Sequence, residues 1–340
     1  MKAGIKTADL VRAFRTSEVK EVYDGLIGVT NLKPTFGTSG DIWVVRGDRA
    51  PNVPNAKSFV YKRLFERVEK DLHANPDYAV FDGTGASSMP ALRFYAQQIG
   101  RESVVVIARE FPRTHLPPGV SKWRDMKIVR ARGQAEKGYL RQMITELQTR
   151  KKIIPLRQAE FGAWAMAPVG NWVVQWFKQH GILPDAFVSV MASGATFYGI
   201  GRVIANNFPS VETTVVIKHS TFNSADLKNK DKVREFARKG LVWYLTSTPD
   251  LPITDVDAMA FPLHLHGASF ALLRVWEETG EPGIDHVVQA TRADTMRVQA
   301  RLRAAGYDWT DTTAFALVEA IRLAEEGKNV VAMVYGKGKD

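Results

Sequence analysis

Short apolar runs alternate with amphipathic segments along most of the chain. Strand-like runs occupy Asp41–Arg46, Tyr78–Phe81, Ser103–Ala108, Met126–Val129, Ala186–Met191, Thr213–Lys218 and Asn329–Val334. Helical periodicity marks Lys57–Asn75, Ser88–Ile99, Gly138–Thr149, Asn171–His180, Tyr198–Asn206 and Thr313–Glu326. This alternation predicts an α/β fold with mostly parallel twisted sheets flanked by helices.

A change of composition near residues 151–161 predicts a boundary between two α/β halves. A basic run gives way there to IIPL and a glycine-containing segment. We therefore expect an N-terminal part, residues 1–160, that includes a smaller α/β domain, and a larger C-terminal domain, residues 161–340.

Composition narrows the possible chemistry. The 340 residues include no cysteine, which excludes a disulfide scaffold, a thiol nucleophile, an iron–sulfur cluster and a Cys-ligated zinc site. No apolar run is long enough to span a membrane and the N-terminus lacks the apolar core of a secretory signal, so a cytoplasmic protein is expected. The net charge of +10 indicates an anionic partner.

Two strand–glycine–helix junctions are the best candidates for binding small anions. In each, glycines allow a tight turn, and the free N–H groups of a helix start attract negative charge. The candidate residues are Thr84, Gly85, Ala86 and Ser87 in the first junction, and Ser193, Gly194, Ala195 and Thr196 in the second. Ordinary helix capping is the alternative for each, and neither junction fits a dinucleotide or P-loop fingerprint.

Taken together, these segments resemble the fold type II family of pyridoxal-phosphate (PLP) enzymes, such as cysteine synthase, threonine dehydratase and the tryptophan synthase β chain. The resemblance runs from about Ile27 to Gly338. Val45–Lys57 looks like the family segment that ends in the Schiff-base lysine. Ala192–Thr196 looks like the phosphate loop, and Thr312–Phe315 looks like the Ser-Ser-Gly-Ala segment.

The resemblance implies PLP as the cofactor and Lys57 as its Schiff-base lysine, with Lys62 one helical turn further on as the alternative. It implies that Ser193, Gly194, Ala195 and Thr196 hold the phosphate and that Thr84, Gly85, Ala86 and Ser87 hold the substrate carboxylate. It also implies that the Thr312 hydroxyl faces the pyridine nitrogen, and the adjacent Asp311 is the alternative. Arg46 and Arg49, near Lys57, could lower its pKa.

Several positions depart from the family pattern. Ala86 stands where the family usually has asparagine, Ala192 and Ala195 replace glycines, and Ala56 replaces the serine before the lysine. We expect a homodimeric lyase or transferase acting at Cα or Cβ of an amino acid, with decarboxylation also open. One alternative is the same chemistry on an amino acid attached to a nucleic acid, as in phage-type DNA base modification, or to another polyanion. A cofactor-free binding protein is the other.

Histidines and tryptophans add weaker candidates. His264 and His266 share a face if their segment is a strand, but no third ligand is near, so no metal site is expected. His115 and His219 are candidates for lining the substrate pocket. Trp164, Trp172 and Trp176 are assigned to the core or to a subunit interface.

Overall fold

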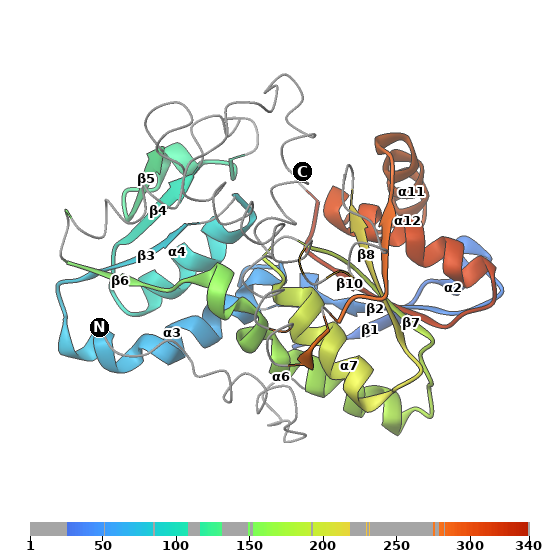
Figure 1. Ribbon diagram of the computed structural model, residues 1–340. Coiled ribbons are helices and arrows are strands. Elements are labelled where there is room, and N and C mark those ends of the chain that lie inside the picture. Colours follow the sequence, from blue (N-terminus) through green and yellow to red (C-terminus); the bar gives the residue numbers. More distant parts are fainter. Residues whose placement is uncertain are drawn as a thin grey trace.

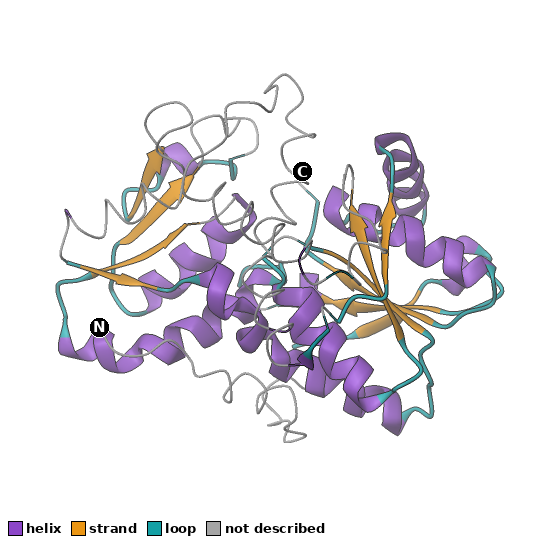
Figure 2. Cartoon of the chain, viewed as in Figure 1, coloured by secondary structure: helices purple, strands orange, loops and turns teal. Residues whose placement is uncertain are grey.

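The computed structural model describes residues 26–50, 52–83, 86–107, 116–130, 149, 152–191, 193–217, 229, 231, 275, 279–281 and 283–338. Its strands form two sheets, each accompanied by helices, that lie next to each other in Figure 1 and Figure 2. The predicted α/β class with mostly parallel sheets is therefore confirmed.

The larger sheet has six strands in the order β1-β2-β10-β7-β8-β9. They are β1 (Val29–Asn31), β2 (Ile42–Arg46), β7 (Ala186–Val190), β8 (Glu212–Ile217), β9 (His286–Gln289) and β10 (Val330–Val334). Only the β1–β2 pair is antiparallel. The central strands β7 and β10 are buried at every position, as is typical of a parallel sheet covered on both faces.

The smaller sheet is entirely parallel, in the order β5-β4-β3-β6. It contains β3 (Ala79–Gly83), β4 (Ser103–Ile107), β5 (Met126–Arg130) and β6 (Ile153–Pro155). The domain boundary at 160/161 stays a prediction. The strands of residues 1–160 are in fact shared between the two sheets, since β1 and β2 join the larger one.

Helices flank both sheets. They are α2 (Lys33–Phe36), α3 (Lys57–Ala74), α4 (Met89–Gln98), α6 (Gln158–Gln179), the π-helix η6 (Phe197–Gly201), α7 (Arg202–Asn207), α11 (Arg292–Ala304) and α12 (Asp311–Glu325), with 3-10 turns η2 (Gly47–Arg49), η3 (Ala86–Ser88) and η5 (Val120–Lys122). The apolar stripe predicted for α3 is buried, from Phe59 to Leu72. Helix α11 was not predicted from the sequence, although Thr291 and Asp294 form a capping box at its start.

Helix α6 begins much earlier than the predicted segment 171–180. Its first half was not predicted from the sequence because it contains Gly162, Pro168 and Gly170. Glycine and proline are poor helix formers. The glycines instead allow close packing against η6. A Cβ atom on Gly170 would lie 2.7 Å from the Gly199 carbonyl oxygen, and one on Gly199 would lie 2.4 Å from Met166 Cβ. This packing fixes the helix that follows the second junction.

The remaining differences from the sequence analysis have simple causes. Strands β1, β6 and β9 have only three or four residues, too few for a clear alternation pattern. The predicted helix at 138–149 lies almost wholly outside the described residues.

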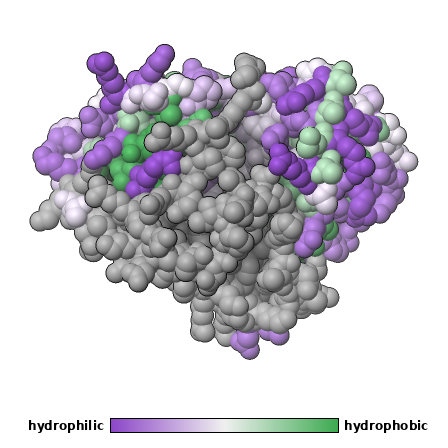
Figure 3. Space-filling view, turned by 90° about the horizontal axis from the view of Figure 1, so that it is seen from above, coloured by the Kyte–Doolittle hydropathy of each residue, from purple (hydrophilic) through white to green (hydrophobic). Residues whose placement is uncertain are grey.

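Seen from above (Figure 3), the described surface is mainly hydrophilic, with an apolar area on the side of the smaller sheet. No helix in the described part is long and apolar enough to cross a membrane.

Candidate active site

Lys57 is the first residue of α3. Its backbone N–H donates to Asn55 Oδ1 at 2.9 Å, and Asn55 Nδ2 donates to the Ser87 carbonyl oxygen at 3.3 Å. A single asparagine side chain therefore connects the start of the lysine helix to the first glycine junction. The sequence analysis missed Asn55, although asparagine just before a helix is a common local hydrogen-bonding residue.

Burial lowers the pKa of Lys57 to about 8, because a desolvated site disfavours the charged ammonium. The negative charge of Asp82 opposes this shift and raises the pKa. The expectation that Arg46 depresses the pKa is not met. The Arg46 guanidinium binds Asp48 instead, with Nε 2.7 Å from Oδ1.

Asp82 lies near the carboxyl end of β3 and is 1% exposed. Its carboxylate accepts hydrogen bonds from Tyr61 Oη at 2.8 Å, from the Gly83 N–H at 2.8 Å, and weakly from the Gln158 N–H at 3.3 Å. Burial raises the pKa of Asp82 to about 6, although these donors and the Lys57 charge act to lower it. The sequence signal for this residue was an acid at the end of an apolar strand, directly before glycine.

The second junction begins just after β7. Gly194 has φ +77°, a left-handed conformation that glycine adopts easily, and helical backbone starts at Ala195. Gln158 Nε2 donates to Ser193 Oγ at 2.7 Å. Because Ser193 accepts this bond, its own O–H proton stays available for a ligand. Ala195 is buried close to Gly162 of α6.

Tyr335 connects the lysine segment to the second junction by another route. Its carbonyl oxygen accepts the Ala56 N–H at 2.9 Å, and its hydroxyl bonds to Ser189 Oγ at 2.7 Å and to the Thr196 side chain. Burial raises the pKa of Tyr335 to about 12, so it is a neutral hydroxyl at physiological pH. Tyr335 thus contacts both the residue before Lys57 and the side chain of Thr196.

Thr312 and Asp311 lie in the first turn of α12. Asp311 is exposed and Thr312 is half-buried. The Thr312 hydroxyl makes no hydrogen bond with the described residues, whereas the Thr313 hydroxyl accepts the Tyr335 N–H at 3.0 Å. Of the two threonines, Thr312 therefore keeps a hydroxyl free for a ligand.

Other predicted site residues can be placed only in part. Thr84, Gly85 and Ala192 lie outside the described residues, as do His115, His219, His264 and His266; Ala86 lies in η3 and Ser87 is exposed. The tryptophans 164, 172 and 176 lie on α6, and Trp176 packs 5.8 Å from Trp43. No group of three or more metal-ligating side chains occurs within the described ranges.

No family model matches the sequence, and no curated protein matches it significantly. Solved structures do match. A hydrogen sulfide-producing enzyme from Fusobacterium nucleatum is 12% identical over 92% of this chain and 95% of its own, with a TM-score of 0.64. O-acetyl serine sulfhydrylase isoform 3 from Entamoeba histolytica is 15% identical over 99% and 91%, with a TM-score of 0.65.

An O-ureido-L-serine synthase is 16% identical over 92% of this chain and 89% of its own, with a TM-score of 0.66. At such identities the likeness establishes the fold. The chain therefore has the fold type II arrangement of PLP-dependent enzymes, as its sequence resemblance predicted.

Proposed function

We propose that this protein is a PLP-dependent enzyme that acts at Cα or Cβ of an amino acid through Lys57. The observation that carries the proposal is the lowered pKa of Lys57 together with its position. Through Tyr335, the start of its helix is connected to the glycine loop of residues 193–196. With a pKa of about 8, about a tenth of Lys57 has a free amine at pH 7, against well under a thousandth for an ordinary lysine.

The residues present fit the cofactor. A phosphate needs several N–H and O–H donors, and residues 193–196 supply a helix start together with a Ser193 hydroxyl whose proton is unused. An aldehyde needs an uncharged amine, which Lys57 offers. A pyridine nitrogen can accept a hydrogen bond, and the Thr312 hydroxyl has one to donate.

Bound PLP supplies an electron sink for negative charge that develops at the substrate Cα. The chain's own residues position the reactants and move the proton. In our proposal, Thr84, Gly85 and Ser87 hold the substrate carboxylate through hydroxyl and backbone donors. Lys57 Nζ takes a proton from Cα and can return it, because its pKa lies near neutral pH.

Within this class, we favour elimination or replacement at Cβ. The names of the three similar structures concern serine derivatives or the production of hydrogen sulfide. Decarboxylation has no such support. The alternative of an amino acid linked to a nucleic acid rests on the +10 net charge and on the altered substrate loop, and the comparisons do not support it. Homodimerisation and a cytoplasmic location also remain predictions.

The test is to load the protein with PLP, reduce it with borohydride, and map the pyridoxyl group by mass spectrometry. We expect a visible absorbance band before reduction and the label on Lys57 afterwards. Lys57→Ala should lose the band and the label, and any turnover should fall at least about a hundredfold, since a general base alone contributes about 10²–10⁴-fold.

Lys62→Ala is the matched control, because it removes the neighbouring lysine on the same helix. It should keep both the band and the label. If the pyridoxyl label in the wild-type protein is found on Lys62, the assignment of Lys57 is overturned. A wild-type protein that stays colourless with PLP in excess would refute the enzyme and favour the cofactor-free binding protein.

A further inference from the structure

We propose that Tyr335 is a positioning residue of this site: its hydroxyl group holds the end of β7, from which the loop of residues 193–196 continues, in place for the phosphate of the cofactor. The inference rests on the proposed function and deepens it. It assigns a role to a side chain that belongs to neither glycine junction and that the sequence analysis did not single out.

Tyr335 lies between the two segments that the proposed function assigns to the cofactor. It directly follows β10, and β10 lies between β2 and β7 in the larger sheet. The three strands are parallel, so their carboxyl ends share one edge of the sheet. Open parallel sheets bind their ligands outside that edge. The chain after β2 leads to Lys57 and the chain after β7 leads to Ser193, so Tyr335 is placed to contact both.

The hydroxyl group of Tyr335 acts where the backbone pairing of β10 with β7 has ended. Among the described residues, only the first two positions of each strand pair with each other. Further along, the Tyr335 hydroxyl bonds to Ser189 Oγ at 2.7 Å and accepts the Val190 N–H at 3.2 Å. It also contacts the Thr196 side chain. A side chain thus replaces the backbone ladder at the end of β7, just before the loop.

The main chain of Tyr335 holds two other parts of the site. Its carbonyl oxygen accepts the N–H of Ala56, the residue before Lys57, at 2.9 Å. Its own N–H donates to Thr313 Oγ1 at 3.0 Å, next to Thr312 in the first turn of α12. Neither bond involves the hydroxyl group. Removal of the hydroxyl should therefore disturb the loop and leave the lysine segment and α12 in place.

The tyrosine ring lies between two parts of the core. It packs against the apolar cluster that contains Phe59 of α3 and against the one that contains Phe315 of α12. Phenylalanine at position 335 keeps this ring and both main-chain bonds. Tyr335→Phe therefore removes the hydroxyl alone and takes an acceptor from the buried Val190 N–H. An N–H that loses its acceptor in the interior is costly, so the end of β7 is expected to shift.

The experiment compares the affinity for PLP with that for pyridoxal, which lacks the phosphate, in phosphate-free buffer. Absorbance titrations of the same protein sample give both dissociation constants. In Tyr335→Phe, the affinity for PLP should fall about three- to tenfold, the worth of one hydrogen bond. The affinity for pyridoxal should stay at its wild-type value. An equal fall for both ligands would mean a general structural role and would refute the proposal, and so would no change in either.

Two further variants test the route and the specificity. Ser189→Ala removes the partner of the hydroxyl and should lower the ratio of PLP affinity to pyridoxal affinity. Tyr335→Phe added to it should lower the ratio by less than in the wild type, because the two side chains share one bond. Fully additive losses would refute the route through Ser189. Tyr307→Phe is the matched control, since it removes the same atom from a half-buried tyrosine that stacks on Trp309. A fall of the ratio in this control equal to that in Tyr335→Phe would overturn the proposal.

The outcomes separate this proposal from the proposed function. A wild-type protein that binds neither PLP nor pyridoxal refutes the proposed enzyme and the role of Tyr335 with it. A wild-type protein that binds PLP, together with an unchanged affinity ratio in Tyr335→Phe, refutes the role of Tyr335 alone.

Discussion

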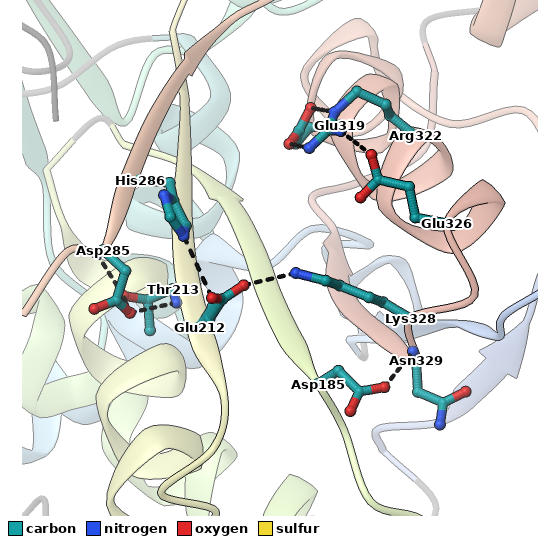
Figure 4. Close-up of polar contacts among 10 residues, drawn as sticks. All are labelled: Asp185, Glu212, Thr213, Asp285, His286, Glu319, Arg322, Glu326, Lys328 and Asn329. Carbon is teal, nitrogen blue, oxygen red and sulfur yellow. Dashed lines mark hydrogen bonds and ion pairs between the residues drawn. The ribbon is translucent and has the colours of Figure 1, made fainter.

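Two acidic side chains, one at the carboxyl end of a strand of the smaller sheet and one at the amino end of a strand of the larger sheet, have pKa values shifted in opposite directions. Asp82, near the carboxyl end of β3, is buried, and its pKa rises to about 6. Glu212, at the amino end of β8, is half exposed. A hydrogen bond from Lys328 Nζ at 2.7 Å is the main cause that lowers its pKa, with a further contribution from His286 (Figure 4).

The comparison shows that access to water decides whether the pKa of each carboxyl group rises or falls. Desolvation disfavours the charged Asp82 more than its hydrogen bonds favour it, whereas the water around Glu212 keeps its desolvation small. Ionised Asp82 therefore costs stability, and ionised Glu212 contributes some. This is the pattern expected if the carboxyl ends carry function and the amino ends carry structure.

The sign of each pH dependence follows. Between the ordinary pKa of 3.8 and about 6, the folded chain holds a proton on Asp82 more tightly than the unfolded chain. This term makes the free energy of unfolding fall as pH rises. Lys57, with its lowered pKa, makes stability rise with pH between about 8 and 10.5. The Glu212 term is present above 4.5 and is lost as pH falls through its lowered pKa.

The largest expected effect is on the pH dependence around Asp82. In the wild type, ionisation of this one group should remove about 2–3 kcal/mol from the free energy of unfolding between pH 4 and pH 7. Asp82→Asn should lack that decrease, because asparagine does not ionise. Urea unfolding across this pH range measures it, and an unchanged slope in the variant would contradict the assignment.

A smaller effect is expected from Tyr61→Phe. The change removes the 2.8 Å hydrogen bond to a charged carboxylate, so it should cost about 1.5–3 kcal/mol at pH 7. The cost should shrink at pH 5, where Asp82 is mostly neutral. Urea unfolding at the two pH values makes the comparison, and an equal cost at both would mean that Asp82 is already neutral at pH 7.

The smallest effect on stability is expected for Glu212, at the exposed amino end of β8. Glu212→Gln breaks the contacts with Lys328 and His286, yet it should cost less than about 1 kcal/mol, since exposed ion pairs are weak. The cost should decline further in high salt because mobile ions screen exposed charges. A larger cost that persists in salt would show that the two ends of the strands differ less than we infer.

Sequence reasoning succeeded where local pattern was sufficient. The α/β class followed from strand–helix alternation, and the α3 stripe from its 3.6-residue period. Residues 193–196 could be nominated because glycine turns before helices have a local signature, whereas Lys57 was nominated by the family resemblance, and both assignments stay predictions. Helix α6 was found only in part, because the glycines and proline that oppose a helix locally are required by its packing against η6.

By itself, then, the sequence determined the fold class and the two junctions, since these depend on residues that are neighbours in the chain. Only the tertiary structure decided that Asp82 is buried with Tyr61 as a hydrogen-bond donor, that Gln158 reaches Ser193, and that β1 and β2 join the larger sheet. The physical reason is that burial and charge–charge attraction depend on distances in space, which one unaligned sequence does not contain. The shifted pKa values of Lys57 and Asp82 are therefore properties of the folded chain.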